Sequence, residues 1–300
     1  SVSSTILMPM QLAVMVAGTK PTTSGQSTAG GSNYMSTPIP KKALGQHWLH
    51  DVNALEGIVE LAQINLGDTV VEVGPGLGTL TKYLLSYQAN VIAIEFDPEL
   101  FDYLRKESTK LFSQDAKRLT LIQHDILTFN FSDLPPDYKV VANIPYYLTS
   151  NLIRVLSEAP NPPLSVTLLI QKEVAERLCA SAGNMSLLSV WAQMYFECSL
   201  GDAVPAALFT PPPKVDSQVV HLQRRTQPLF GDADKKHLHR VIKAGFSNKR
   251  KTLHNSLAAG LHMPKSDIEQ ILKSASISAK ARPQELTIEN WLNLSQHINQ

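Results

Sequence analysis

Residues 140–147 read VVANIPYY, and the chain is organised around this stretch. Two valines lead into a polar run that contains a proline, which is typical of a buried strand that ends abruptly. In open α/β sheets, ligands bind at the carboxyl ends of the strands. At this end Asn143 brings an amide, Pro145 fixes the backbone, and Tyr146 offers a flat face for stacking. Taken alone, the stretch also fits a simple junction between a strand and a turn.

The composition describes a globular chain of one large domain or two. Its 300 residues are 43% hydrophobic and 18% charged, and the net charge of +1 favours no nucleic-acid partner globally. No apolar run reaches about 18 residues, so we expect no membrane span. Cys179 and Cys198 lack metal-site spacing. We therefore expect no metal, and the two thiols fit a reducing compartment such as the cytoplasm.

The first 40 residues differ from the rest. They carry one charged residue, Lys20, and residues 19–38 are crowded with Ser, Thr, Gly and Pro. We expect residues 1–40 to be a disordered leader. The apolar patch at 6–17 has no basic segment before it, and the leader has no arginine. Both features argue against a secretory or mitochondrial signal, although an organellar address stays open as an alternative.

A nucleotide-binding unit is predicted after residue 67. Residues 68–73 read as a strand, the turn GPGLG follows at 74–78, and residues 79–87 read as a helix. Glycines in such a turn let the backbone approach a ligand closely. The G-x-G-x-G spacing differs from the G-x-G-x-x-G of dinucleotide-binding proteins. By itself the turn is a modest signal.

Two carboxylates lie at the carboxyl ends of the next two predicted strands. Glu95 ends the strand at 90–96, and Asp125 follows the strand at 119–124. A carboxylate at the first position can accept hydrogen bonds from both ribose hydroxyls, and one at the second from an adenine amino group. Glu95 therefore indicates adenosine without identifying the cofactor. Together with the glycine turn and Asn143, these groups place four polar clusters along one sheet edge.

The remaining stretches are weaker signals. Lys41 and Lys42 precede GQHWL at 45–49, which fits either a flap over a ligand or a solvated loop. The run FTPPPK at 209–214 fits a stiff segment near the site or a plain connector. Further elements are predicted as follows: helices at 53–63, 98–110, 171–179, 187–196, 266–275 and 287–298, and strands at 165–170, 200–204 and 218–223.

Basic residues concentrate near the C-terminus. A helix is predicted over 232–250, and residues 232–256 contain seven lysines and arginines against two aspartates. Lys249, Arg250 and Lys251 follow one another at the expected helix end. They favour contact with phosphate groups, and the alternative is a solvated helix end; the family resemblance given below makes RNA the expected partner of these three residues.

Taken together, the chain resembles the ribosomal RNA adenine N6,N6-dimethyltransferase family, in its small-subunit rRNA type. The matching stretches lie in the family's order over residues 41–300: LGQHWL, EVGPGLGTLT, IEFD, HDIL, NIPYYL, QKEVAERL, LFTPPPKVDSQVV and FSNKRKTLHNSL. The resemblance implies a Rossmann-like α/β sheet that binds S-adenosylmethionine (SAM) at residues 41–226. It also implies a small, all-helical RNA-binding domain at residues 227–300.

The implied reaction is SAM-dependent N6,N6-dimethylation of adenines, at two adjacent adenines near the 3′ end of small-subunit rRNA. The partner would be that rRNA or the immature small ribosomal subunit, and the enzyme would act in ribosome biogenesis as a monomer.

The resemblance also implies roles for individual residues. The cofactor site would comprise Gln46, His47, Leu49, Glu72, Gly74, Gly76, Glu95, Asp125 and Asn143. The catalytic set would comprise Asn143, Ile144, Pro145, Tyr146 and Phe209. Here Asn143 and the Ile144 carbonyl would accept the hydrogens of the adenine amino group. Tyr146, with Phe209 as a second face, would stack on the extruded base; core packing is the alternative for both rings.

Two positions depart from the family. Trp48 stands where the family usually has phenylalanine, and we expect little effect because an aromatic ring is kept. Residues 185–187 replace a Lys-x-Tyr-Gly stretch, so RNA contacts of the loop at 182–187 can differ. Three other functions compete: a large-subunit rRNA methylase of the resistance type, an RNA- or DNA-binding assembly or transcription factor without chemistry, and an NAD oxidoreductase.

Overall fold

The structure is a computed structural model that describes residues 14–16, 37–248 and 250–298. The chain divides into two compact units. The sheet unit comprises Ser1–Ile170 and Gly201–His221, and the helical unit comprises Gln171–Leu200 and Leu222–Gln300. Residues 171–200 thus group with the C-terminal helices, whereas the predicted border after residue 226 leaves them with the sheet. Most of the predicted leader lies outside the described residues, and only Val14–Val16 within 1–36 form a described strand.

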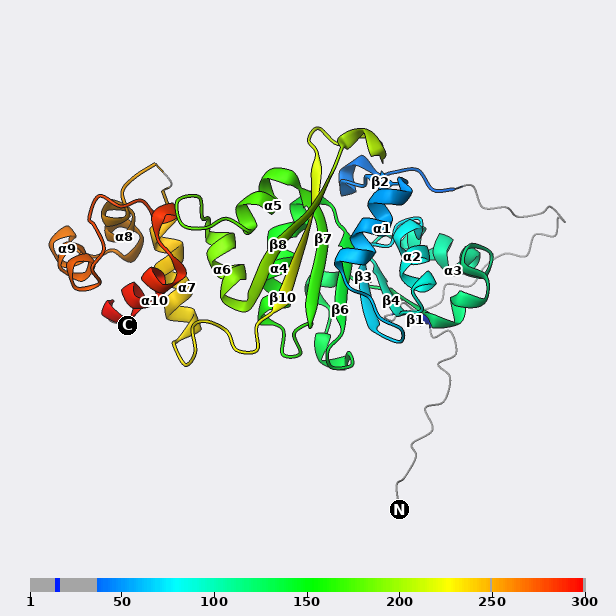
Figure 1. Cartoon of the computed structure of the whole chain (residues 1–300), viewed down its shortest axis with the longest axis horizontal. Coiled ribbons are helices and arrows are strands. Elements are labelled where there is room, and N and C mark those ends of the chain that lie inside the picture. Colours follow the sequence, from blue (N-terminus) through cyan, green and yellow to red (C-terminus); the bar gives the residue numbers. More distant parts are fainter. Residues whose placement is uncertain (1–13, 17–36, 249, 299–300) are drawn as a thin grey trace, which may run out of the picture. The chain divides into compact units, whose positions relative to one another are not determined.

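A mostly parallel sheet dominates the fold, which confirms the predicted Rossmann-like α/β class (Figure 1). Its strand order is β1-β5-β4-β3-β6-β7-β10-β8. Strands β1 and β3–β7 pair in parallel, with register partners such as Val71 with Ile92 and Val140. The strands are β1 Val14–Val16, β3 Thr69–Val73, β4 Asn90–Glu95, β5 Leu119–Gln123, β6 Lys139–Asn143, β7 Ser165–Gln171, β8 Phe196–Val204 and β10 Ser217–Arg224.

The strand order reverses next to β3. The chain runs outward through β4 and β5 and then returns to place β6 on the other side of β3. Connections that leave in opposite directions open a crevice at the carboxyl ends of the two strands, where ligands bind in open α/β sheets. The glycine turn after β3 and Asn143 at the end of β6 therefore lie at one place.

Four helices belong to the sheet unit: α1 Val52–Leu61, α2 Thr79–Ser86, α3 Pro98–Phe112 and α4 Thr149–Glu158. Asp51 caps α1 and Asp97 caps α3, each through its side chain. Helices α2 and α3 pack on β4, where Leu84, Val91 and Leu104 share one buried apolar cluster. Helix α4 is not among the predicted elements, although its buried Leu152, Ile153 and Leu156 follow helical spacing.

A two-stranded ribbon joins two segments that are distant in sequence. Strand β2, Trp48–Leu49, pairs antiparallel with β9, Phe209–Thr210, so that Trp48 faces Thr210 and Leu49 faces Phe209. The proline-rich run at 209–214 thus begins as a strand. This pairing fixes the predicted flap against the segment after residue 208.

The helical unit contains α5 Lys172–Leu178, α6 Leu187–Tyr195, α7 Lys235–Gly245, α8 Leu253–Leu261, α9 Lys265–Ser274 and α10 Ile288–His297. Leu238, Val241 and Ile242 form the buried side of α7, and Trp291 of α10 is fully buried. The helix predicted over 232–250 ends at Gly245, so its predicted C-terminal part is wrong. Within residues 37–248 and 250–298, no helix is long and apolar enough to cross a bilayer.

Short 3-10 helices complete the secondary structure: Lys42–Leu44, Ser113–Arg118, Ile126–Thr128, Phe131–Asp133, Tyr146–Leu148, Ala206–Leu208 and Pro283–Glu285. In the helical unit, the backbone N–H groups of Gly183 and Met185 both donate to the Gln284 carbonyl, at 2.8 and 3.3 Å. Ser186 then caps α6. The loop that departs from the family is thus held by backbone hydrogen bonds to Gln284, in the 3-10 helix at Pro283–Glu285.

Two helical glycines should respond oppositely to substitution by alanine. A Cβ at Gly260 would lie 2.8 Å from Cα of Ala244, whereas at Gly57 the nearest atom is Oδ2 of Asp202 at 3.7 Å. We expect Gly260→Ala to lower the free energy of unfolding by about 1–3 kcal/mol through overpacking. We expect Gly57→Ala to raise it by about 0.5–1 kcal/mol through helix propensity. Urea unfolding of both variants tests this, and stabilisation by Gly260→Ala would contradict the close packing of α7 on α8.

Candidate functional site

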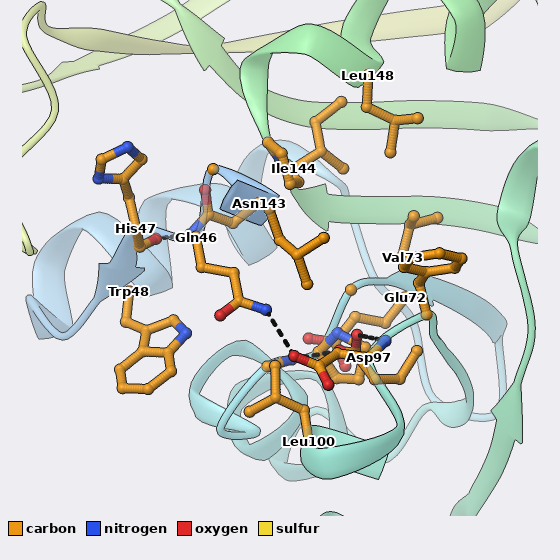
Figure 2. A pocket seen from close by; sticks show the side chains of 18 of the residues that line it. Gln46, His47, Trp48, Glu72, Val73, Asp97, Leu100, Asn143, Ile144 and Leu148 are labelled. Carbon is orange, nitrogen blue, oxygen red and sulfur yellow. Dashed lines mark hydrogen bonds between the residues drawn. The ribbon is translucent and has the colours of Figure 1, made fainter. Parts of the chain in front are cut away.

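A pocket lies at the reversal of strand order, inside the sheet unit (Figure 2). Its wall comes from five segments that are separate in sequence: the flap at 44–49, the turn at 72–80, the strand ends at 94–97 and 124–127, and the stretch at 143–148, with Phe209. Every residue that the resemblance implies for the cofactor site lines this pocket, as does the whole implied catalytic set. The structure therefore brings these residues together, and their chemical roles stay predictions.

The glycine turn shapes one wall. Gly74, Gly76 and Gly78 have φ values of 67°, 59° and 81°, a region that side chains with a Cβ rarely adopt. A Cβ at Gly74 would meet no atom within 4 Å, so this backbone borders open space. The residue after the turn, Thr79, starts α2, which has no side-chain cap. Unpaired N–H groups at a helix start favour an anionic or acceptor group nearby.

Glu95 is buried at the end of β4 and is held by the backbone. Its Oε1 accepts from Asp97 N at 2.8 Å, and its Oε2 accepts from Gly76 N at 3.1 Å. Burial raises the pKa of Glu95, although these two hydrogen bonds lower it in part. Each carboxylate oxygen can accept more than one hydrogen bond. Glu95 thus has remaining acceptor capacity at the position predicted for the ribose.

Asp125 lies beyond the end of β5, where it caps the 3-10 helix at Ile126–Thr128. Its Oδ1 accepts from Leu127 N at 2.9 Å. This bond fixes the carboxylate at the pocket wall, next to the half-buried His124. The nitrogen Nδ1 of His124 bonds to the backbone oxygen of Asp125 at 2.8 Å, so His124 has a local structural partner.

Asn143 connects the end of β6 to the flap. Its Nδ2 donates to the backbone oxygen of His47 at 3.3 Å (Figure 2). This bond uses one of the two amide N–H groups and sets the direction of the amide, so the side-chain oxygen and one N–H remain for a ligand. Ile144, directly after Asn143, is 3% exposed and also lines the pocket.

Tyr146 is fixed at both its ring and its hydroxyl. The hydroxyl lies 2.8 Å from Oγ of Ser217, which is fully buried at the start of β10. The ring is stacked with the His47 imidazole, with centroids 6.1 Å apart and 21° between the planes. Nδ1 of His47 in turn lies 2.7 Å from the Pro211 oxygen. The proline-rich segment therefore positions the flap and, through it, the aromatic ring.

The flap is also tied to the far side of the pocket. Lys41 Nζ lies 2.8 Å from Oδ1 of Asp97, and Gln46 Nε2 donates to Oδ2 at 3.2 Å. Asp97 is 2% exposed. Although burial opposes it, hydrogen bonds from Lys41, the Glu99 backbone and Gln46 hold the pKa of Asp97 below its ordinary value. Asp97 is thus an anionic anchor for the segment that contains His47.

Residues 40–300 match the family described as ribosomal RNA adenine dimethylase. The chain belongs to this family. It is 41% identical over 269 residues to "Ribosomal RNA small subunit methyltransferase A" of Lactobacillus delbrueckii subsp. bulgaricus, which covers 86% of this chain and 90% of that protein. The protein of the same name from Dehalococcoides mccartyi is 39% identical, with 85% of this chain and 87% of that protein covered.

Two solved structures have a similar fold. A dimethyladenosine transferase from Plasmodium falciparum superposes with a TM-score of 0.68 at 26% identity, over 83% of this chain and 96% of that one. The 23S rRNA methyltransferase ErmE superposes with a TM-score of 0.64 at 28% identity, over 84% of this chain and all of that one. The family resemblance stated from the motifs is thereby confirmed.

Four residues outside the implied set hold the site in place: Lys41, Asp97, Pro211 and Ser217. Of these, Asp97 lines the pocket, and the other three support it from behind the lining residues. The pair Asp97-Pro98 was a usable signal, because an aspartate before a proline at a helix start is a typical cap. Nothing in the sequence linked Ser217 to Tyr146, because only the sheet order brings them together.

Of the implied residues, Leu49 and Phe209 are 1% and 4% exposed and belong to the apolar core as well as to the pocket wall. Lys249 lies outside the described residues. Arg250 and Lys251 are exposed between α7 and α8.

Glu72, implied as a neighbour of the cofactor, is fully buried and accepts from Oγ1 of Thr81 at 2.6 Å. Burial, with a smaller contribution from Glu95, raises its pKa from 4.5 to about 8. Folding therefore takes up a proton between these pH values, and stability should fall by up to about 1.4 kcal/mol per pH unit from about pH 5.5 to about pH 8. Well below the unfolded-state pKa of 4.5 Glu72 is protonated in both states, so its contribution there is constant.

Glu72→Gln should flatten this pH dependence, because the amide does not titrate and its oxygen can still accept from Thr81. Urea unfolding across the pH window measures the slope for both proteins. Glu60→Gln, at an exposed position of α1, makes the same chemical change as a control. An equal slope for wild type and Glu72→Gln would show that Glu72 is ionised in the folded protein.

Proposed function

We propose that this protein transfers methyl groups from SAM to the exocyclic N6 of adenines in small-subunit rRNA, twice at each adenine. The observation that carries the proposal is the orientation of Asn143, whose amide nitrogen donates one hydrogen bond to the His47 carbonyl. This bond sets the direction of the amide, and its oxygen remains as an acceptor in a pocket that Tyr146 also lines. Membership of the ribosomal RNA adenine dimethylase family supports the same activity.

The pocket residues fit SAM. Glu95 offers acceptor capacity for the ribose hydroxyls, and Asp125 offers it for the adenine amino group. The turn at Gly74 leaves open space next to the backbone, as close approach of a ligand requires. When bound, SAM supplies a methyl group activated by the positive sulfur.

The residues around Asn143 prepare the acceptor nitrogen. The N6 lone pair of adenine is delocalised into the ring, which makes the amino group a poor nucleophile. Hydrogen bonds from its two N–H groups to Asn143 Oδ1 and the Ile144 carbonyl favour a pyramidal nitrogen with a localised lone pair. The new N–C bond would form as the S–C bond of SAM breaks, and the nitrogen would release a proton to solvent. The monomethyl product keeps one N–H, so a second round gives the dimethyl product.

Tyr146 would hold the extruded base by stacking. Its half-buried ring is fixed by Ser217 and by the His47 imidazole, which limits the entropy lost when a base binds. Phe209 is 4% exposed and supports the pocket wall from the core, so we assign it a smaller part in base contact. Pro145 fixes the backbone between the acceptor and the ring.

We favour small-subunit rRNA as the substrate because the curated relatives at 39–41% identity carry that name. The resemblance to ErmE keeps the large-subunit alternative in the test. The partner would be the rRNA or the immature small subunit, met by a monomer in the cytoplasm. These finer statements rest on the resemblance.

The test uses the full chain with SAM and unmodified small or large ribosomal subunits. Digestion of the rRNA and mass spectrometry should show N6,N6-dimethyladenosine in the small-subunit rRNA alone. Dimethylation of the large-subunit rRNA would instead identify that rRNA as the substrate. RNA binding without any methylated nucleoside would favour the non-catalytic alternative.

Asn143→Ala should slow single-turnover methylation by about a hundred- to a thousand-fold, the loss typical of a transition-state hydrogen-bond partner. RNA affinity and the unfolding temperature should persist, because the substrate keeps its stacking and phosphate contacts. Asn53→Ala, at an exposed position of α1, serves as the control and should leave the rate unchanged. Near-normal turnover in Asn143→Ala would show that Asn143 has no catalytic role and only ends a strand. A parallel loss of RNA binding and rate would make it a substrate anchor.

Replacing Lys249, Arg250 and Lys251 with alanine should weaken RNA binding and leave SAM binding intact. The slope of log affinity against log salt should fall by about 0.7–0.9 for each lost phosphate contact. A matched triple variant at the exposed Lys265, Lys273 and Lys280 removes the same charge elsewhere in the helical unit. If both triple variants change the salt slope equally, the effect comes from net charge, and residues 249–251 make no specific contact with RNA.

A further inference from the structure

Trp48 has a hydrogen-bond donor in the pocket wall that the protein itself does not use. Its Nε1 is buried and has no hydrogen-bond partner among the residues that the structure describes. The indole stands on β2 and borders the pocket, with its nitrogen-bearing edge turned toward the hollow that Gln46 and Asp97 also face (Figure 2). A Cβ at Gly76 would lie 3.5 Å from this nitrogen, so the donor is directly beside the glycine turn.

Two other tryptophans share the lack of a partner but not the setting. Trp191 packs against the His239 ring at 4.8 Å, and Trp291 against Phe246 at 5.3 Å, both within the helical unit. Their rings are only 5% and 0% exposed, so packing accounts for them. Trp48 alone of the three borders a ligand pocket. A buried donor without a partner is costly, and a ligand acceptor is what would satisfy it here.

We propose that the Trp48 indole N–H donates a hydrogen bond to the carboxylate of the methionine part of SAM. This inference deepens the proposed function and rests on it. The nucleoside half is provided with acceptors for its hydroxyl and amino groups by Glu95 and Asp125. A carboxylate needs donors instead, and an indole can only donate.

The place of Trp48 supports this choice of acceptor. The indole lies beside Gly76, in the turn that leads into α2, whose first N–H groups carry a partial positive charge and have no side-chain cap. A negative carboxylate is favoured at such a helix start. Glu95, in contrast, presents a carboxyl group in the inner wall, which disfavours a carboxylate there.

If the Trp48 N–H binds the carboxylate, tryptophan at this position is not equivalent to the phenylalanine that the family usually has. Both side chains supply an aromatic ring to the wall, but phenylalanine has no N–H. Trp48→Phe is therefore a substitution that removes the donor and keeps most of the packing. In the protein without ligand it also removes a buried unsatisfied group, so the unfolding temperature should stay equal or rise.

Calorimetric binding of two probes to the full chain tests the proposal. S-Adenosylhomocysteine carries the carboxylate, and 5′-methylthioadenosine has the same nucleoside and sulfur without it. We expect Trp48→Phe to bind S-adenosylhomocysteine about tenfold more weakly, as loss of a hydrogen bond to a charged group implies. The affinity for 5′-methylthioadenosine should not change. Tryptophan emission of the wild type should shift with the first probe and not with the second.

The outcomes separate the proposals. Equal weakening for both probes would place the contact on the nucleoside half and overturn the assignment to the carboxylate. Unchanged affinity for both, with wild-type binding and methylation intact, would overturn the role of Trp48 and leave the proposed function standing. Failure of the wild type to bind S-adenosylhomocysteine would overturn both. If Trp48→Phe does not fold, the emission of the wild type decides, and an equal shift with both probes would refute the proposal.

Discussion

The parallel pairing of β3 with β6 is the constraint on which the site depends. These strands are neighbours in the sheet although β4 and β5 come between them in sequence. Their pairing places the glycine turn and Asn143 at adjacent strand ends, on opposite sides of the crevice. Both strands are almost wholly buried and carry valines at their centres, so a shift of register would disrupt their packing and is strongly disfavoured. The hydrophobic core thereby fixes the distance between the cofactor wall and the methyl-acceptor wall.

The flap adds the polar half of this arrangement. One backbone carbonyl, that of His47, sets the direction of the Asn143 amide, and the ring of the same residue packs on Tyr146. The flap reaches this place because β2 pairs with β9 on one side and Asp97 holds Lys41 and Gln46 on the other. A buried carboxylate with three donors is a strong anchor, since each bond to it is charge-assisted. The acceptor site is consequently ordered only when the flap is ordered.

The sequence predicted well what depends on local pattern. The strand, turn and helix around Gly74 and the carboxylates that follow β4 and β5 lie where their spacing placed them. Prediction from the sequence failed for features that depend on tertiary contacts. Helix α4 follows a proline and two tyrosines, which masked its apolar spacing. Helix α7 ends at Gly245, although Lys249 and Arg250 suggested a longer helix. The roles of Ser217 and Pro211 depend on the order of strands in the sheet, which no local pattern contains. The Trp48 donor became visible only when its surroundings showed no acceptor.

The chemistry of the acceptor site follows from what its ionisable groups cannot do. Burial raises the pKa of Tyr146, so its hydroxyl stays protonated at neutral pH and cannot act as a general base. Glu95 is engaged by two backbone donors and Glu72 by Thr81, each on the cofactor side of the crevice. An adenine amino group at Asn143 would therefore meet neutral acceptors. This suits a reaction in which the nitrogen gains positive charge only as the bond to carbon forms and loses its proton afterwards. Neutral oxygens that are already oriented stabilise that charge without first binding the substrate as an ion pair, so their effect falls on the transition state.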